Sequence, residues 1–133
     1  MPKWTRLADF WINLPDQPGE LARLAARLRE ADVNLLGLWG YGAENGQARF
    51  YCVPQSAEQF RNFAMSAELP AREGCTFYLH EIDRGGTLVQ TLEKIASADI
   101  NLLAIQAVAI NGECGCFLWA NTNDWPALEE LLG

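Results

Sequence analysis

The sequence ADVNLL at residues 31–36 recurs 67 positions later as ADINLL at residues 98–103. Five of the six positions are identical, and the remaining one exchanges Val33 for Ile100. The same displacement aligns further pairs, among them Phe10 with Phe77, Asp16 with Asp83, Gly19 with Gly86 and Leu21 with Leu88. Agreement over this length indicates that the chain consists of two copies of one structural unit.

The first copy has the pattern of a strand, a helix, two strands and a second helix. Residues 6–14 alternate between two faces, which is typical of a strand. Residues 21–28 carry apolar side chains at the i, i+3, i+4 and i+7 positions of a helix. Residues 33–41 and 49–53 are predicted strands. The sequence Asn45-Gly46 between them favours a type I′ hairpin turn.

Two further signals mark the helix starts of this copy. Asp16 and Pro18 stand where a helix start favours a capping side chain and a first-turn proline. Ser56 and Gln59 have the spacing of a capping box, and they open a second helix that carries Phe60 and Ala64.

The second copy repeats the pattern. Strands are predicted at residues 75–81, 100–110 and 116–119, with a hairpin at residues 111–112. Its helices carry Leu88, Leu92 and Ile95 in the first, and Trp125, Leu128, Leu131 and Leu132 in the last. For the last helix we expect Thr122 or Asn123 as the cap and Pro126 in the first turn.

The domain organisation follows from this repeat. We expect a first unit at residues 1–70 and a second unit at residues 71–133. Each copy lacks one strand of the split β-α-β, ferredoxin-like unit. We therefore predict that the strand at about residues 75–82 is shared by both units and that the early part of the first strand serves the second unit.

Composition and charge narrow the class of protein. The 133 residues are 50% hydrophobic and 20% charged, with a net charge of −7. No apolar stretch reaches the length of a membrane helix, and the N-terminus lacks the apolar core of a secretory signal. We expect a soluble cytoplasmic protein. The acidic balance argues against nucleic acid or an anionic membrane as a partner.

The sequence offers no catalytic or cofactor pattern, so we expect a protein that is not an enzyme and holds no cofactor. His80 is the single histidine and has no recognisable catalytic partner in the sequence. Cys114 and Cys116 share one strand face, but a soft-metal site would need further ligands. We interpret them as small buried side chains and expect no metal.

The turn and the repeated hexapeptide together resemble the ACT domain family. LPDQPGEL at residues 14–21 followed by DVNL at residues 32–35 matches its pattern, a D-x-P-G-x-L turn and then x-[VI]-N-[LI]. The second copy matches with DRGGTL at residues 83–88 and DINL at residues 99–102, but Gly85 replaces the proline.

The resemblance implies an α+β fold of two ferredoxin-like βαββα(β) units in tandem, with antiparallel sheets and helices on one face. It also implies sensing of a small ligand, usually an amino acid, at an interface between paired units. The first turn of one unit and the second-strand region of its partner hold such ligands. These modules usually regulate an attached or partner enzyme.

The chemistry of the matching residues suits a zwitterion. A glycine turn exposes the unpaired N–H groups of a helix start to a carboxylate, an aspartate can receive an ammonium group, and an asparagine can donate and accept. The candidate ligand-binding residues are Asp16, Gly19 and Asn34 in the first copy, and Asp83, Gly86 and Asn101 in the second. Arg84 is a candidate partner for the ligand carboxylate. The alternative is that these residues cap, pack or bend the chain and bind nothing.

The second strands of both copies are apolar on both faces, which leaves apolar surface that another chain can cover. We therefore predict a homodimer or larger assembly. The alternative function is a ligand-free oligomerisation module, in which the same surfaces only hold subunits together.

Overall fold

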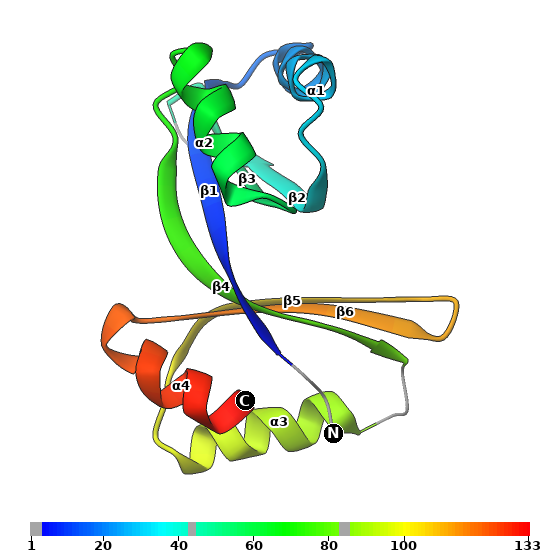
Figure 1. Cartoon of the computed structure of the whole chain (residues 1–133), viewed down its shortest axis with the longest axis vertical. Helices are drawn as coiled ribbons and strands as arrows, with labels where there is room; N and C mark the ends of the chain where they lie inside the picture. The colour runs from blue at the N-terminus through cyan, green and yellow to red at the C-terminus, as the bar shows by residue number, and fades with distance from the viewer. Residues whose placement is uncertain (1–3, 43–44, 83–85) are drawn as a thin grey trace. The chain divides into compact units, whose positions relative to one another are not determined.

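The structure, a computed structural model, describes residues 4–42, 45–82 and 86–133. The strands follow the hydrogen-bonded order β2-β3-β1-β4-β6-β5 (Figure 1). The elements, in chain order, are β1 Thr5–Pro15, α1 Glu20–Glu30, β2 Leu35–Gly42, β3 Gln47–Pro54, α2 Ala57–Ser66, β4 Arg72–Ile82, α3 Thr87–Ser97, β5 Leu102–Ile110, β6 Glu113–Ala120, the short 3-10 helix η1 Thr122–Asp124 and α4 Trp125–Leu132.

The chain divides into two compact units. The N unit is Ala8–Gly74, and the C unit combines Met1–Leu7 with Cys75–Gly133. Strands β1 and β4 each contribute residues to both units, because residues 5–7 of β1 fall in the C unit and residues 72–74 of β4 fall in the N unit.

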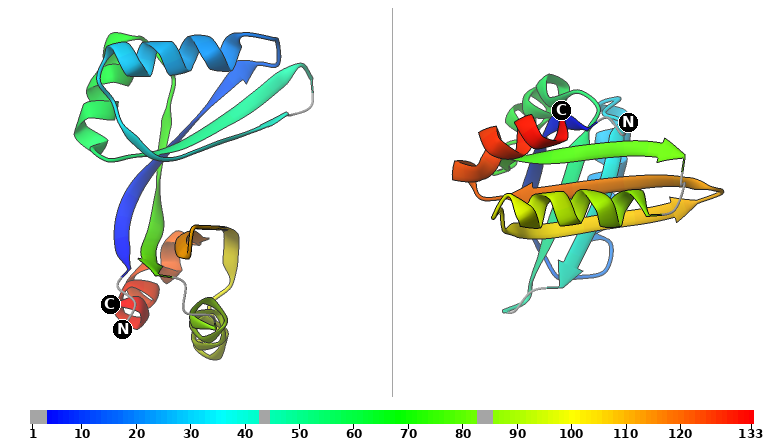
Figure 2. Two further views of the ribbon diagram at one scale, coloured as in Figure 1. Left: turned by 90° about the vertical axis from the view of Figure 1, so that its right-hand side faces the viewer. Right: turned by 90° about the horizontal axis from the view of Figure 1, so that it is seen from below.

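In the N unit, α1 and α2 cover one face of the sheet (Figure 2). Strand β1 pairs antiparallel with β3 so that Phe10 lies opposite Cys52 and Ile12 opposite Phe50. These side chains face the helices and form a core with the buried Leu24, Leu28, Val33, Phe60 and Ala64. Alternation along β1 therefore places one apolar face against both helices.

The C unit has the same arrangement, with α3 and α4 on one face of its strands (Figure 2). Strand β4 pairs antiparallel with β6 so that Phe77 lies opposite Leu118 and Leu79 opposite Cys116. Its core contains these residues together with Trp4, Cys75, Ile95, Ile100, Ala120, Leu128 and Leu132. Leu28 and Ile95, at matching repeat positions, are 4% and 2% exposed, which confirms the predicted helix stripes.

Both predicted hairpin turns are confirmed by their backbone angles. Asn45 and Gly46 have φ of 64° and 71°, and Asn111 and Gly112 have φ of 52° and 79°. Two consecutive positive φ values define the type I′ turn, which asparagine and glycine tolerate best.

The repeated hexapeptide encodes the end of a helix. At the C-terminus of α1, the N–H of Val33 donates to the carbonyl of Leu28 at 3.0 Å, and the N–H of Asp32 donates to the carbonyl of Arg29 at 3.0 Å. Asp32 has φ of 60°. This is the Schellman motif, with the left-handed residue followed by an apolar one that packs back onto the helix. In the second copy, Asp99 and Ile100 make the same bonds at the end of α3.

Three sequence-based expectations at element ends are wrong. The N-cap of α1 is Gly19, with no side-chain capping bond, so Asp16 does not cap the helix and Pro18 lies before it. The N-cap of α4 is Asp124 rather than Thr122 or Asn123, because η1 occupies those positions. Strands β2 and β5 begin at Leu35 and Leu102, two residues later than expected, because the helix caps use the residues before them.

The Ser56 cap is confirmed, since its hydroxyl accepts from the Gln59 N–H at 3.2 Å. The final helix also has Pro126 in its first turn, as predicted.

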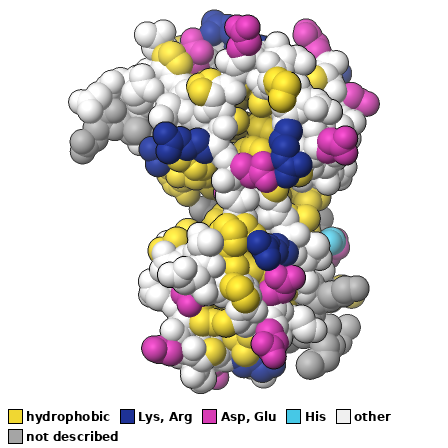
Figure 3. Space-filling model, turned by 60° about the vertical axis from the view of Figure 1, so that its left-hand side comes forward, with side chains coloured by type: hydrophobic (Ala, Val, Ile, Leu, Met, Phe, Trp, Pro, Cys, Tyr) yellow, Lys and Arg dark blue, Asp and Glu magenta, His cyan; other side chains and the backbone are white. Residues whose placement is uncertain are grey.

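The two edge strands of the sheet expose apolar side chains. On β5, Leu103, Val108 and Ile110 are 60%, 56% and 64% exposed. On β2, Leu38 and Tyr41 are 46% and 50% exposed. Hydrophobic side chains reach the surface of both units between charged ones (Figure 3).

Candidate functional site

The turn before α1 places Asp16 beside the β2–β3 hairpin. The Asp16 N–H donates to the carbonyl of Gly46 at 2.8 Å. Its Oδ2 lies 3.6 Å from the position that a Cβ on Gly42 would occupy. Gly19 has φ of 90°, which a residue with a side chain rarely adopts. The N-cap Gly19 provides no side-chain cap to α1, and the Glu20 N–H donates to the carbonyl of Gln17 at 3.3 Å.

Asn34 lies at the start of β2, at the opposite end of that strand from the β2–β3 hairpin and Asp16. It directly precedes β2, and its carbonyl accepts from the Gln55 N–H at 2.9 Å. Strand β2 has eight residues, which at 3.3 Å per residue separate its ends by roughly 25 Å. Within the N unit, the structure does not bring Asn34 together with Asp16 and Gly19.

The second copy repeats this separation. Gly86 lies beside residues 107–109 near the end of β5, whereas Asn101 directly precedes the start of β5. Asp83 and Arg84 lie outside the described residues. Asp16 and Gly19 therefore lie at the opposite end of the N unit from Asn34, and Gly86 lies at the opposite end of the C unit from Asn101.

The first pocket lies at the start of α3 in the C unit, and we call it the α3 pocket. Its volume is about 250 Å³. The N-cap Gly86 has φ of 77° and, as a glycine, provides no side-chain cap to the first N–H groups of α3. The walls are Leu79, Glu81, Gly86, Thr87, Leu88, Val89, Ala107, Val108, Ala109, Cys114 and Cys116.

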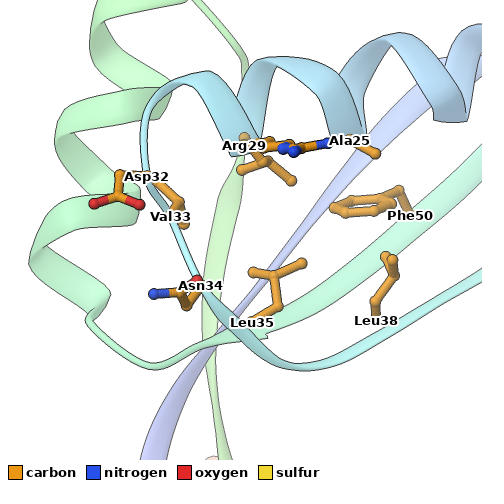
Figure 4. Close-up of a pocket in the computed structure, with 9 residues that line it drawn as sticks. Ala25, Arg29, Asp32, Val33, Asn34, Leu35, Leu38 and Phe50 are labelled. Atoms are coloured by element: carbon orange, nitrogen blue, oxygen red, sulfur yellow. The ribbon is translucent and has the colours of Figure 1, made fainter.

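The second pocket lies under the C-terminal half of α1 in the N unit, and we call it the α1 pocket. Its volume is about 210 Å³. In Figure 4, Arg29 and Ala25 line the side formed by α1, Leu38 and Phe50 form a second side, and the chain at 33–35 forms the third. The Asp32 carboxylate points away from Phe50 and Leu38. Asn34 is thus the one predicted site residue of the first copy that lines this pocket.

Sequence reasoning missed polar residues in both pockets. Alternation along residues 75–81 places Glu81 on the same face as the buried Phe77 and Leu79, and a carboxylate on an apolar face is a detectable signal. Thr87 follows the predicted turn directly. Arg29 gave no signal, because an arginine in the last turn of an amphipathic helix is typical of a solvated face.

The cysteines are thiols with different surroundings. Cys52, Cys75 and Cys116 are buried and Cys114 is half-buried. Burial raises the pKa of Cys52 to about 12, with a further contribution from the negative charge of Asp9. Burial also raises the pKa of Cys116 to about 12, helped by the neighbouring Cys114. Both thiols are therefore protonated at neutral pH.

No three His, Cys, Asp or Glu side chains in residues 4–42, 45–82 and 86–133 gather in an arrangement that could hold a metal ion. No helix in this part of the chain has the length and hydropathy to span a membrane.

Comparison with known proteins finds the same fold in several solved structures. No protein-family model matches the chain, and no curated protein sequence matches it. Among solved structures, the protein BT0572 of Bacteroides thetaiotaomicron aligns with a TM-score of 0.80 at 15% identity, covering 97% of this chain and 88% of that one. The ligand-free regulatory subunit of aspartate kinase from Thermus thermophilus aligns with a TM-score of 0.65 at 12% identity, covering 98% and 93%.

A third structure is a full enzyme. Aspartokinase III of E. coli, in complex with lysine and aspartate in its T-state, aligns with a TM-score of 0.56 at 16% identity, covering 98% of this chain and 33% of that one. These likenesses concern the fold. They confirm the tandem, ferredoxin-like, ACT-type architecture expected from the repeated turn and hexapeptide.

Proposed function

We propose that this chain is a non-catalytic regulatory module that senses a free amino acid and controls a partner or attached enzyme. Its fold is that of regulatory subunits of aspartate kinase, and one such kinase was solved with lysine and aspartate. The observation that carries the proposal is the α3 pocket, where a cavity meets a helix start that has no side-chain cap.

The α3 pocket has the chemistry of an amino-acid site. The first N–H groups of α3 and the positive end of its dipole favour a carboxylate. Glu81 offers a carboxylate to the ligand's ammonium group, and the Thr87 hydroxyl can donate or accept. Leu79, Ala107 and Val108 supply an apolar wall for a side chain. Pockets for drug-sized ligands begin at roughly 300 Å³, so the cavity of about 250 Å³ suits a smaller ligand such as an amino acid.

The remaining candidate residues fit a site completed by a second chain. Asp16 and Gly19 lie at one end of the N unit and Asn34 at the other. A ligand that contacts both groups therefore needs two units, one offering its turn and the other its second-strand start. The same reasoning applies to Gly86 and Asn101 in the C unit, and Asp83 and Arg84 precede Gly86 in the sequence. We accordingly propose a homodimer in which these residues contribute to ligand binding.

A thermal-shift screen across the twenty amino acids tests the sensing function. A ligand at 100 times its dissociation constant should stabilise the folded state by about 2.7 kcal/mol. We expect one amino acid or a small related group to raise the Tm. If none does so at millimolar concentration, the sensing function is wrong.

Isothermal titration of variants with the amino acid found in the screen tests the residues. Asp16→Ala and Asn34→Ala form one pair, and Asp83→Ala and Asn101→Ala form the matched pair in the other copy. Glu81→Gln tests the α3 pocket alone and nearly preserves side-chain size. Each substitution at a true contact should weaken binding by about tenfold or more. If all five variants bind as the wild type does, the ligand lies elsewhere.

The exposed apolar side chains of β5 favour a second candidate function, a ligand-free assembly module. Leu103, Val108 and Ile110 lie on an edge strand, where another chain can add both apolar contact and backbone hydrogen bonds. Analytical ultracentrifugation separates the cases when read with the thermal screen. A stable dimer with no response to any amino acid would favour assembly, whereas a concentration-independent monomer at micromolar protein would reject the dimer.

A further inference from the structure

The α1 pocket differs from the α3 pocket in its polar chemistry. Its walls are largely apolar, formed by Leu28, Val33, Leu35, Leu38 and Phe50. The cation among its lining residues is Arg29, which reaches along the α1 side of the pocket toward Ala25 (Figure 4). The acid beside it, Asp32, is turned the other way (Figure 4).

Arg29 differs from the other arginines of its helix. Arg23 pairs with Glu20 at 2.7 Å, and Arg27 donates to the carbonyl of Ala67 at 3.3 Å. Within residues 4–42, 45–82 and 86–133, the Arg29 guanidinium makes neither an ion pair nor a side-chain hydrogen bond. Its donors are therefore available to a ligand, and a guanidinium binds a carboxylate with two parallel hydrogen bonds.

The helix end behind the pocket is already satisfied. The carbonyls of Leu28 and Arg29 accept the Schellman hydrogen bonds from Val33 and Asp32. The backbone there offers a ligand no vacant acceptors at those two positions, and the Asn34 amide, like the Asp32 carboxylate, points away from Phe50 and Leu38 (Figure 4). Recognition therefore falls to the side chain of Arg29. An anion is favoured at Arg29 and an apolar group against Leu38 and Phe50.

The internal repeat shows that these features are specific to the N unit. At the positions displaced by 67, Ala25 corresponds to Leu92 and Arg29 to Ala96. Leu92 packs against the core of the C unit. The second copy therefore has a larger side chain where the N unit has room, and an alanine where the N unit has its guanidinium.

We propose that the α1 pocket is a second binding site, for a small carboxylate with a short apolar tail. The carboxylate pairs with Arg29, and the tail lies against Leu38 and Phe50. The site is independent of the amino-acid site proposed at the start of α3, and it requires no amino group on its ligand.

Isothermal titration of the full chain with 4-methylpentanoate tests this site, with 4-methylpentan-1-ol as the uncharged control of similar shape. We expect the acid to bind at least about tenfold more tightly than the alcohol, because a hydrogen-bonded charge pair is lost with the alcohol. No binding of the acid at millimolar concentration, or equal binding of acid and alcohol, would overturn the proposal.

Three variants locate the binding. Arg29→Ala and Ala25→Leu each install the residue of the second copy, the first removing the cation and the second filling the space. Both should weaken binding of the acid by about tenfold or more. Arg23→Ala, which removes an equal charge from the same helix, should leave it unchanged. All three residues are exposed on α1, so we expect all three variants to fold, and circular dichroism checks this.

The outcomes separate this site from the proposed function. Acid binding that Arg29→Ala and Ala25→Leu leave intact would overturn the α1 site and leave the amino-acid sensor standing. If no amino acid raises the Tm in the thermal screen, the proposed sensing function is overturned, and the 4-methylpentanoate result is unaffected.

Discussion

The N unit and the C unit end their first helices with the same motif, whereas the α1 pocket and the α3 pocket lie at opposite ends of those helices. Both α1 and α3 finish in a Schellman motif with a left-handed aspartate. The α1 pocket lies beside that end in the N unit, and the α3 pocket lies at the helix start in the C unit. The comparison teaches that the repeat preserved the residues that shape the backbone while the side chains that shape cavities diverged.

The ion pairs of the two units make the same point. Glu73 and Arg6 occupy matching repeat positions, each near the start of a strand that enters the other copy's unit. Glu73 accepts two bonds of 2.7 Å from Arg61 of α2, whereas Arg6 donates to Glu129 of α4 at 3.0 Å. In each unit an ion pair thus connects the second helix to the start of a long strand. In the N unit the helix α2 supplies the cation and β4 the anion, whereas in the C unit the helix α4 supplies the anion and β1 the cation.

The largest expected effect tests whether the shared architecture is equally important in both units. Leu28→Ala and Ile95→Ala each leave a cavity in a core, and each should cost about 2–5 kcal/mol of unfolding free energy. Urea unfolding followed by circular dichroism measures both. If one of the two substitutions is tolerated, the units are not equivalent in their packing.

Substitution of one glycine in each unit by alanine should have a smaller effect on stability, and the effect should differ between the two units. A Cβ on Gly74 would lie 2.7 Å from Oδ1 of the buried Asp9, whereas a Cβ on Gly115 would meet nothing within 4 Å. We expect Gly74→Ala to destabilise the protein by about 1–3 kcal/mol. Gly115→Ala should be neutral or slightly stabilising, since alanine restricts the unfolded chain. Equal Tm values for the two variants would contradict the close approach at Gly74.

The helix ends should respond alike. Asp32 and Asp99 have φ of 60° and 61°, so valine at either position should cost about 1–2 kcal/mol through its branched side chain. Glycine at the same positions serves as the control and should be tolerated. A valine variant as stable as its glycine counterpart would mean that the Schellman motif does not fix the chain at that point.

How far the sequence predicts this protein depends on which residues carry the information. Backbone-dictating residues such as Asn45, Gly46, Asp32 and Ser56 made the hairpins, the repeat and one cap predictable, because few residue types tolerate those conformations. The start of α1 was less predictable, since Asp16 and Gly19 both suit an N-cap and only the three-dimensional turn selects the glycine.

The candidate site was predictable only in part. The family-like turns identified Gly19 and Gly86, and the hexapeptides identified Asn34 and Asn101, but the separation of turn and asparagine within each unit emerges only from the fold. Glu81 and Arg29 line pockets because of how neighbouring strands and helices pack, and no local pattern marks an arginine as lacking an ion-pair partner.

The smallest expected effect on stability comes from the ion pair between Arg61 and Glu73 in the N unit. The Arg61 guanidinium holds the pKa of Glu73 below its usual value, mainly through their hydrogen bonds. Because the folded pKa is lowered, this contribution to stability is present at neutral pH and is lost as the pH falls through that lowered value. Glu73→Gln should therefore lower the Tm slightly at pH 7 and leave it unchanged near pH 2. A difference from wild type that persists undiminished in acid would contradict the ion-pair origin.

The most direct test of the sensing account is a ¹H–¹⁵N correlation spectrum recorded during titration with the amino acid that most raises the Tm. The account predicts that amide signals from residues 86–89 and 107–109, around the α3 pocket, shift progressively and saturate. The core amides of the N unit, such as those of Phe10 and Phe60, should stay in place. Saturating shifts confined to residues outside the α3 pocket, the Asp16–Gly19 turn and the two asparagines Asn34 and Asn101, or an unchanged spectrum at millimolar ligand, would contradict it.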